Sequence, residues 1–382
     1  MNKHNSFFIV IVCVLIFFIF SCTQGVQPKD SNSRKTDAID LLPGFENPAF
    51  TLDNEKLSQL VKSIENGKFG NIHSLVIILN DRLVLEEYFQ GWTRNKLHKI
   101  HSASKSVASA LIGIAIDKGN IKGLQDKLLN FFPEYKSIAH LDERKKAITL
   151  EDVLTMSAGF KWNEVDTPYF DKKGNSNPDN DAVKALQSSD CIKHTLDLPT
   201  INTPGSVFAY NSGGSLLLSG IIQNTTGESA EEFARKNLFE PLGIKEWEWR
   251  TISNNISDTC AGLKLRPVDM ALFGYLYLKN GKIFDQQLIS KEWIKKSTAY
   301  YIDGSFDGYG YHWWRRTTLS LDEDSYAVQD NNIYFAFGAF GQSIFILPDY
   351  NMVVVMTGKN AVFPHESFDI LEKHIVPALR KR

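Results

Sequence analysis

The segment from residue 99 to residue 119, KIHSASKSVASALIGIAIDKG, places the strongest constraint on the fold of this chain. From Val107 onward it reads as a helix that is apolar on nearly every face, and such a helix must be buried on all sides. The chain therefore has to enclose this helix within a large domain. The first turns of the same segment carry three serines and a lysine, and polar groups buried at such a place need partners.

Ser102 and Lys105 lie three residues apart, so on a helix their side chains share one face. A serine hydroxyl becomes a nucleophile when a neighbouring base accepts its proton. Lysine can be that base if burial and the positive end of the helix dipole lower its pKa from about 10.4. The spacing therefore predicts a serine nucleophile paired with a lysine of depressed pKa. A surface lysine in the first turn is the alternative interpretation.

Two further motifs carry groups that suit the same chemistry. Tyr210 lies in FAYNSGG, directly before a predicted helix, where a phenol can donate or accept a proton. A packed loop tyrosine is the alternative. The segment 336–342, AFGAFGQ, is a predicted strand whose small residues let a backbone N–H approach a ligand, as an oxyanion donor must. A bulge in an edge strand is the alternative there.

In this order and at these separations, the three motifs resemble those of the serine β-lactamase and penicillin-binding-protein superfamily. The likeness is greatest to the class C β-lactamase-like branch that includes esterases and aminohexanoate-dimer hydrolases. It runs from about residue 55 to the end of the chain and includes ITLEDVLTMSAGF, LFEPLGI, AGLKLRPVDMALFGYLYLKNG and GYGYHWW. The resemblance implies the α/β fold of β-lactamases and transpeptidases: an antiparallel sheet flanked by helices, with an inserted all-helical domain.

The resemblance also implies a role for each matching residue. Ser102 matches the acylated nucleophile, and Lys105 matches its base partner. Tyr210 matches the tyrosine that relays a proton to the leaving group, and the oxyanion hole would be the backbone N–H groups of Ser102 and Ala339. Ser212 stands where β-lactamases have asparagine.

Two positions depart from the Lys-Thr-Gly motif of the family, because Ala336 replaces the lysine and Phe337 replaces the threonine. The lost cation would meet the carboxylate of a β-lactam through a charge-assisted contact. We therefore expect a neutral or aromatic-lined acyl pocket. The residues expected to bind substrate are Gly338, Phe340, Trp313 and Trp314.

The resulting interpretation is a serine hydrolase that cleaves an ester or amide bond through an acyl-enzyme on Ser102. One alternative is a β-lactamase or D-alanyl-D-alanine carboxypeptidase that acts on β-lactams or cell-wall peptides. An alternative of another class is a non-catalytic binding or sensor protein on the cell surface. The expected partner is a small-molecule ester, amide or peptide.

The N-terminus is predicted to be a targeting segment. Residues 7–20, FFIVIVCVLIFFIF, are too few to span a membrane comfortably but suit the core of a signal peptide. The following Ser21-Cys22 resembles a bacterial lipoprotein cleavage site, with residues 1–22 as the signal peptide. The alternative is an uncleaved anchor. We therefore expect an exported protein, periplasmic or on the cell surface, held to the membrane by a lipid on Cys22.

The remaining chain divides into a tether and one hydrolase domain. Residues 23–50 are polar and are predicted to be a flexible tether. Strand patterns near both ends of residues 51–382, with helical patterns between them, predict a sheet built from both ends of the domain. The α/β part is expected at about 51–125 and 260–382, and the helical part at about 126–259.

Composition excludes several other classes of function. The formal net charge is −2 and no basic stripe is present, so binding of nucleic acid is not expected. The nine histidines show no paired ligand spacing, and we expect neither a metal nor another cofactor. Cys191 and Cys260 are the two cysteines beyond the signal segment; two cysteines in a chain of this length are more often free and buried, and a single bridge between them in an oxidising periplasm is the alternative.

Overall fold

The structure is a computed structural model, and it describes residues 37–44, 49–320, 326–361 and 365–381. The predicted signal peptide and the lipid anchor on Cys22 lie outside the described residues. Asp37–Arg382 form one compact unit. Over the described ranges, no helix combines the length and the hydropathy needed to cross a membrane.

An eight-stranded antiparallel sheet lies at the centre of this unit, with the strand order β3-β2-β14-β13-β12-β11-β10-β9. Strand β2 comes from the N-terminal part of the chain and pairs with β14 from the C-terminal part, so that Leu79 lies opposite Met352. The sheet is therefore built from both ends of the domain, as the sequence predicts. Its strands are β2 (Ile72–Leu79), β3 (Arg82–Tyr88), β9 (Ile302–Asp303), β10 (Gly308–Tyr309), β11 (Trp314–Ser320), β12 (Tyr326–Gly338), β13 (Gln342–Leu347) and β14 (Met352–Gly358).

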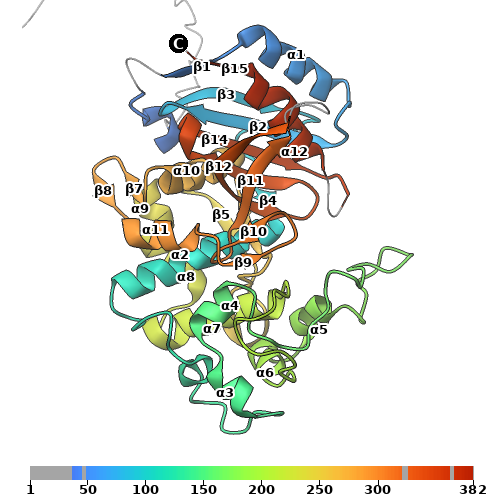
Figure 1. Ribbon diagram of the computed structural model, residues 1–382, viewed down its shortest axis with the longest axis vertical. Helices are drawn as coiled ribbons and strands as arrows, with labels where there is room; N and C mark the ends of the chain where they lie inside the picture. The colour runs from blue at the N-terminus through green and yellow to red at the C-terminus, as the bar shows by residue number, and fades with distance from the viewer. Residues whose placement is uncertain (1–36, 45–48, 321–325, 362–364, 382) are drawn as a thin grey trace, which may run out of the picture. The chain divides into compact units, whose positions relative to one another are not determined.

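Helices cover both faces of the sheet because successive side chains of a strand point to opposite faces. In β2, Leu75 and Ile77 pack in the same apolar cluster as α1 and α12, whereas Val76 and Ile78 pack with α2 and α10. Figure 1 shows α1 and α12 on one side of the sheet and α10 on the other. These helices are α1 (Asn54–Glu65), α2 (Ser104–Asp117), α10 (Pro267–Leu278) and α12 (Glu366–Ile370).

Helix α2 is the apolar helix that the sequence predicts to be enclosed, and its residues from Ser104 to Ala115 are all buried. It contacts α10 and the sheet through one apolar cluster, and it also packs against α7 and α8. The prediction of burial on every face is confirmed.

The segment predicted as helical, residues 126–259, contains mostly short helices and one strand, β5. The longest of these helices is α7, which begins after Asn211, whose side chain accepts a hydrogen bond from the backbone N–H of Gly214. The helices are α3 (Glu143–Ala147), α4 (Leu150–Leu154), α5 (Asp181–Gln187), α6 (Cys191–Leu196), α7 (Ser212–Thr226), α8 (Ala230–Ala234) and α9 (Glu240–Leu242).

The remaining elements are short. Strands β4 (His98–Lys99), β5 (Trp247–Trp249) and β6 (Leu263–Leu265) form a small sheet, β1 (Phe50–Leu52) pairs with β15 (Leu379–Lys381), and β7 (Lys282–Ile283) pairs with β8 (Gln286–Gln287). Helix α11 is Lys291–Ser297. The single-turn segments are η1 (Ala38–Leu41), η2 (His101–Ala103), η3 (Leu128–Phe131), η4 (Arg235–Phe239), η5 (Ser253–Asn255), η6 (Pro348–Tyr350), η7 (Leu371–Ile375) and η8 (Val376–Ala378).

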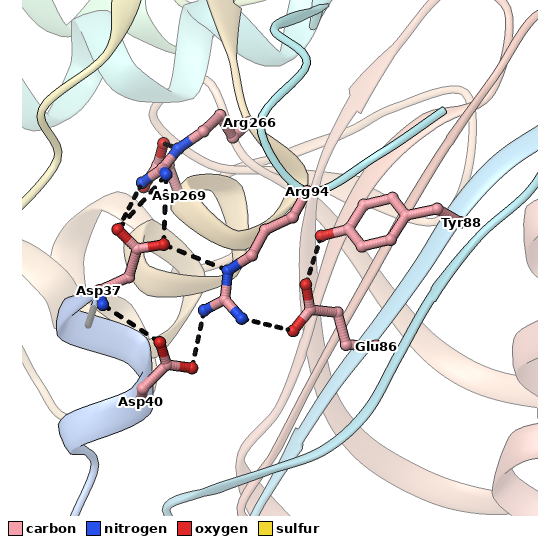
Figure 2. Close-up of polar contacts among 7 residues, drawn as sticks. All are labelled: Asp37, Asp40, Glu86, Tyr88, Arg94, Arg266 and Asp269. Atoms are coloured by element: carbon pink, nitrogen blue, oxygen red, sulfur yellow. Dashed lines mark hydrogen bonds and ion pairs between the residues drawn. The ribbon is translucent and has the colours of Figure 1, made fainter. Parts of the chain in front are cut away.

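A network of ion pairs joins the start of the described chain to the domain (Figure 2). The carboxylate of Asp37 accepts hydrogen bonds from Arg94 Nε at 3.1 Å and from Arg266 Nη1 at 3.2 Å. Arg266 also pairs with Asp269 in α10 at 2.6 Å, and Arg94 pairs with Glu86 in β3 at 3.0 Å. One carboxylate thus connects the residues before β1 to both a helix and an edge strand.

Because of this network, the folded domain starts earlier in the sequence than predicted. Residues 23–50 are predicted as a flexible tether, but Asp37 is buried and β1 pairs with β15 at the far end of the chain. The folded domain therefore begins at Asp37, earlier than residue 51. The polar composition of this segment is misleading because Asp37 and Asp40 find partners within the domain.

Candidate active site

Ser102 and Lys105 lie where the turn η2 leads into α2. The Lys105 ammonium donates hydrogen bonds to Ser102 Oγ at 3.2 Å, to Ser212 Oγ at 3.0 Å and to the carbonyl oxygen of Cys260 at 3.0 Å. Three acceptors match the three protons of an ammonium group. The side chain of Lys105 is only 2% exposed, so these contacts replace the water that it has lost.

Tyr210 completes the group from the loop before α7. Its phenol hydrogen-bonds with Ser102 and Lys105, and Lys105 Nζ lies 4.8 Å from the centre of its ring. The ring stacks on Trp314 with centroids 5.6 Å apart, which fixes its orientation. Motifs more than 100 residues apart in the sequence thus meet around the hydroxyl of Ser102.

The charge state of Lys105 differs from the expectation. Burial acts to lower the pKa of Lys105, but electrostatic interactions with Tyr210, Cys260 and Glu164 act in the opposite direction and the net pKa is raised above its ordinary value. Burial also raises the pKa of Tyr210, although Lys105 counteracts this rise. At neutral pH the resting pair is therefore an ammonium and a phenol. The predicted depressed pKa of Lys105 is wrong because the sequence did not reveal which groups surround it: Tyr210, Cys260 and a buried carboxylate together outweigh the effect of burial.

That carboxylate belongs to Glu164, which is 1% exposed. It accepts hydrogen bonds from the backbone N–H of Ser212 at 2.6 Å, from Ser212 Oγ at 2.8 Å, from Trp162 Nε1 at 2.7 Å and from the hydroxyl of Tyr169 at 2.7 Å. Because Ser212 Oγ also accepts from Lys105, Glu164 lies one hydroxyl away from the ammonium.

Glu164 is the residue that sequence reasoning missed. Residues 164–181 are polar and read as a solvated loop, yet Glu164 and Asn180 are both buried. Asn180 holds the loop by donating to the carbonyl oxygens of Glu164 at 3.0 Å and Thr167 at 2.6 Å. No spacing rule identifies such a carboxylate, since Ser212, which links it to Lys105, comes from another part of the chain.

A cavity of about 450 Å³ opens beside Ser102. Of the residues predicted for the site, Tyr210, Ser212, Trp314, Ala339 and Phe340 line it together with Ser102. Further aromatic rings in its wall come from Tyr169, Phe170, Phe306 and Phe337. The expectation of an aromatic-lined pocket next to the nucleophile agrees with this geometry.

Gly338 and Trp313 have other roles than the predicted contact with substrate. A Cβ atom on Gly338 would lie 2.1 Å from the carbonyl oxygen of Ile100, so glycine lets β12 approach η2 and bring Ala339 toward Ser102. Trp313 is fully buried and stacks on Phe273 of α10 at 5.9 Å. It does not line the cavity, whereas its neighbour Trp314 points to the other side.

Strand alternation also separates Ala336 from Phe337. Ala336 packs in the cluster that contains α2 and α10, while Phe337 belongs to the opposite cluster and lines the cavity. Of the two substituted positions in the Lys-Thr-Gly motif, the aromatic one therefore shapes the pocket.

A family model described as Beta-lactamase matches residues 73–367 of this chain. The chain belongs to this β-lactamase family. The predicted resemblance to the serine β-lactamase and penicillin-binding-protein superfamily is thereby confirmed.

Individual relatives in the β-lactamase family are distant. Beta-lactamase-like protein 2 of Dictyostelium discoideum is 23% identical over 257 residues, which cover 64% of this chain and 42% of that protein. The chain thus spans less than half the length of this curated relative.

Solved structures share the fold at low identity. A protein of Bacillus anthracis provisionally named 6-aminohexanoate-dimer hydrolase has a TM-score of 0.64 and 22% identity, covering 81% of this chain and 79% of that chain. EstCE1, a hydrolase with promiscuous acyltransferase activity, has a TM-score of 0.64 and 15% identity, covering 83% of this chain and 97% of that chain. These likenesses confirm the predicted β-lactamase/transpeptidase-like fold.

Two further predictions concern metals and cysteines. Among the described residues, no cluster of three or more His, Cys, Asp or Glu side chains is arranged to hold a metal ion. Cys191 and Cys260 are both free and buried. Cys260 contributes to the site through its carbonyl oxygen, which accepts a hydrogen bond from Lys105.

Proposed function

We propose that the protein is an exported serine hydrolase that cleaves an ester or amide bond through an acyl-enzyme on Ser102. The observation that carries this proposal is the 3.2 Å contact between Lys105 Nζ and Ser102 Oγ at the wall of an aromatic cavity. Tyr210 and Ala339 line the same cavity, so a nucleophile, a proton carrier and an oxyanion donor lie within one space.

In the proposed reaction, the hydroxyl of Ser102 attacks the carbonyl carbon of the substrate. After the Lys105–Tyr210 pair has released one proton to solvent, it accepts the proton of Ser102 and passes it to the leaving group, which is general acid–base catalysis by positioned side chains. The backbone N–H groups of Ser102 and Ala339 stabilise the oxyanion. Water then releases the acyl group from Ser102 and regenerates the free hydroxyl.

An ester or linear amide is favoured over a β-lactam by the residues at 336 and 337. By the family resemblance, Ala336 replaces the lysine that would meet the β-lactam carboxylate, and Phe337 adds an aromatic ring to the cavity wall. A hydrogen bond between charged groups contributes about 1.5–3 kcal/mol, so its loss weakens capture of a β-lactam by about tenfold or more.

Intact-mass spectrometry tests the nucleophile. We expect one covalent adduct of a fluorophosphonate on the purified protein and none on the Ser102→Ala variant, whose turnover should fall by several orders of magnitude. On the wild type, kcat/KM should be higher for a short-chain p-nitrophenyl ester than for nitrocefin. Retention of more than a tenth of the activity by Ser102→Ala contradicts the assignment, and efficient nitrocefin hydrolysis with feeble esterase activity favours the β-lactamase alternative.

A further inference from the structure

The cavity beside Ser102 has a cationic end. Lys99 and Arg250 line it together with apolar side chains such as Val165, Phe170 and Val183. Lys99 ends β4, three residues before the nucleophile, and Arg250 directly follows β5 of the same small sheet. Regular structure therefore places both cations in the wall of the cavity that Ser102 also lines.

The carboxylate of Asp258 balances only one of the positive charges of Lys99 and Arg250. Arg250 forms an ion pair with Asp258, whose side chain is fully buried. The other oxygen of Asp258 accepts hydrogen bonds from the backbone N–H groups of Cys260 at 3.2 Å and Ala261 at 3.0 Å. Two cations and one carboxylate leave one positive charge at this end of the cavity.

Other ionisable groups around the cavity do not change this balance. Burial lowers the pKa of His101 to about 3, so its ring is neutral at pH 7. Glu164 is enclosed by its own donors and offsets the charge of Lys105 through Ser212.

Lys99 is the cation without a counter-ion. It lies opposite Lys264 in β6, which in turn lies opposite Glu248 in β5. Lys264 pairs with Glu248 at 2.5 Å. Among the described residues, no ion pair or hydrogen bond joins the Lys99 ammonium to another group. A half-buried charge in this position lacks the compensation that buried charges normally have.

We propose that Lys99 and Arg250 bind a carboxylate of the substrate, so that the natural substrate is an anionic ester or amide with an apolar remainder. The reaction of this substrate rests on the proposed function, but its binding does not. The cation that the family carries in the strand of its Lys-Thr-Gly motif is absent at Ala336, and β4 and β5 supply cations from another wall of the cavity. A bound carboxylate must accordingly be placed differently from that of a β-lactam.

Binding to the Ser102→Ala variant tests the proposal without turnover. Isothermal titration calorimetry compares monobenzyl glutarate with its methyl ester, and the succinate and adipate homologues vary the distance between the two ends. We expect the acid of the best-fitting length to bind about tenfold more tightly than its ester, as a charge-assisted contact at a partly exposed site allows.

Variants made in the same background identify the cation. Lys99→Met keeps an unbranched apolar chain without the ammonium and should remove most of the preference for the acid, and Arg250→Gln should reduce it. Lys264→Met, opposite Lys99 but outside the cavity wall, is the matched control and should leave the preference intact. In the Ser102→Ala parent, added NaCl should also weaken the preference, because salt screens a solvent-accessible charge.

The outcomes separate this proposal from the hydrolase proposal. Equal affinities for acid and ester at all three lengths, or a preference that survives loss of both cations, overturn the anion site. Ser102-dependent hydrolysis without any acid preference leaves the hydrolase and removes the anion site. If the acid binds preferentially but the wild type hydrolyses nothing, the anion site stands and the hydrolase proposal is contradicted.

Discussion

At the scale of single residues, the charge of Lys105 depends on a carboxylate that lies far from it in the sequence. Glu164 reaches Lys105 through the hydroxyl of Ser212 and contributes to the raised pKa of the ammonium. A proton must leave this site before Ser102 can become an effective nucleophile. We therefore expect kcat/KM to rise with pH from neutral into the alkaline range.

Glu164→Gln tests this linkage. The two oxygens of Glu164 face different donors, and the new amide nitrogen can face the hydroxyls of Ser212 and Tyr169, which can rotate to accept. Removing the negative charge takes away an interaction that raises the pKa of Lys105, so the proton leaves at lower pH. The rising limb of kcat/KM should move to lower pH.

The control for this variant is Glu248→Gln, which neutralises an exposed carboxylate in β5. Its pH profile should match that of the wild type. A purely structural role for Glu164 predicts a uniform loss of activity with an unmoved limb, and that result contradicts the linkage.

At the scale of elements, β12 sets the geometry of the site through the alternation of its side chains. Ala336 faces α2 and α10, Phe337 faces the cavity, and Gly338 allows the strand to approach η2. The position of the backbone N–H of Ala339 near Ser102 results from this approach of the strand. It does not depend on the side chain of Ala339.

Gly338→Ala should therefore damage catalysis more than its single methyl group suggests. The added Cβ would lie 2.1 Å from the carbonyl oxygen of Ile100, and the strand must move away from η2. Loss of one oxyanion donor lowers kcat by about 100- to 1,000-fold, and we expect a loss of this size with a p-nitrophenyl ester.

Gly123→Ala is the matched control for the added methyl group, because a Cβ there would meet no atom within 4 Å. It should keep wild-type kcat and Tm. Unchanged turnover in Gly338→Ala would mean that the N–H of Ala339 is not an oxyanion donor.

At the scale of the whole molecule, the ends of the described chain are tied to the domain by ion pairs and by a two-stranded sheet. Asp37→Ala should lower the free energy of unfolding by about 2 kcal/mol, between the values for exposed and buried ion pairs. In this variant Arg266 still pairs with Asp269 and Arg94 still pairs with Glu86, so only part of the ion-pair network is lost. Urea unfolding at pH 7 measures the change.

Asp285→Ala is the control, since this carboxylate is fully exposed and forms only a long contact of 3.6 Å with Lys282. We expect no measurable change in its unfolding midpoint. Equal stability of Asp37→Ala and the wild type would show that the N-terminal segment docks without contributing to the fold.

Export is a second prediction at this scale, and it rests on Ser21-Cys22 following the apolar run of residues 7–20. In a bacterial host, the full chain should be found with the membranes and should incorporate a labelled fatty acid. Cys22→Ala should abolish the label, whereas Cys13→Ala, within the apolar run, should retain it. An unprocessed and unlabelled wild type would indicate an ordinary anchor or a protein that is not exported.

The sequence by itself determined the features that depend on short spacings and on side-chain periodicity. The three-residue separation places Ser102 beside Lys105 on one face, and the apolar length of the same segment requires an enclosed helix. Strand patterns near both ends of the domain predict a sheet shared between them. The motifs that include Tyr210 and Ala339 identify the family because their order along the chain is part of the signal.

Only the tertiary structure decided which charges surround these residues. Glu164 and Lys99 reach the site through a folded loop and a small sheet, and no periodicity in the sequence reports either approach. The upward shift in the pKa of Lys105 comes from Tyr210 and Cys260 and, after them, from Glu164. Which of the neighbouring Trp313 and Trp314 faces the cavity was likewise decided by the fold, in which Trp314 pairs with Phe335 of β12 and lines the cavity while Trp313 packs on Phe273. Electrostatic interactions act through space, so their sign at a site is known only when the chain has folded around it.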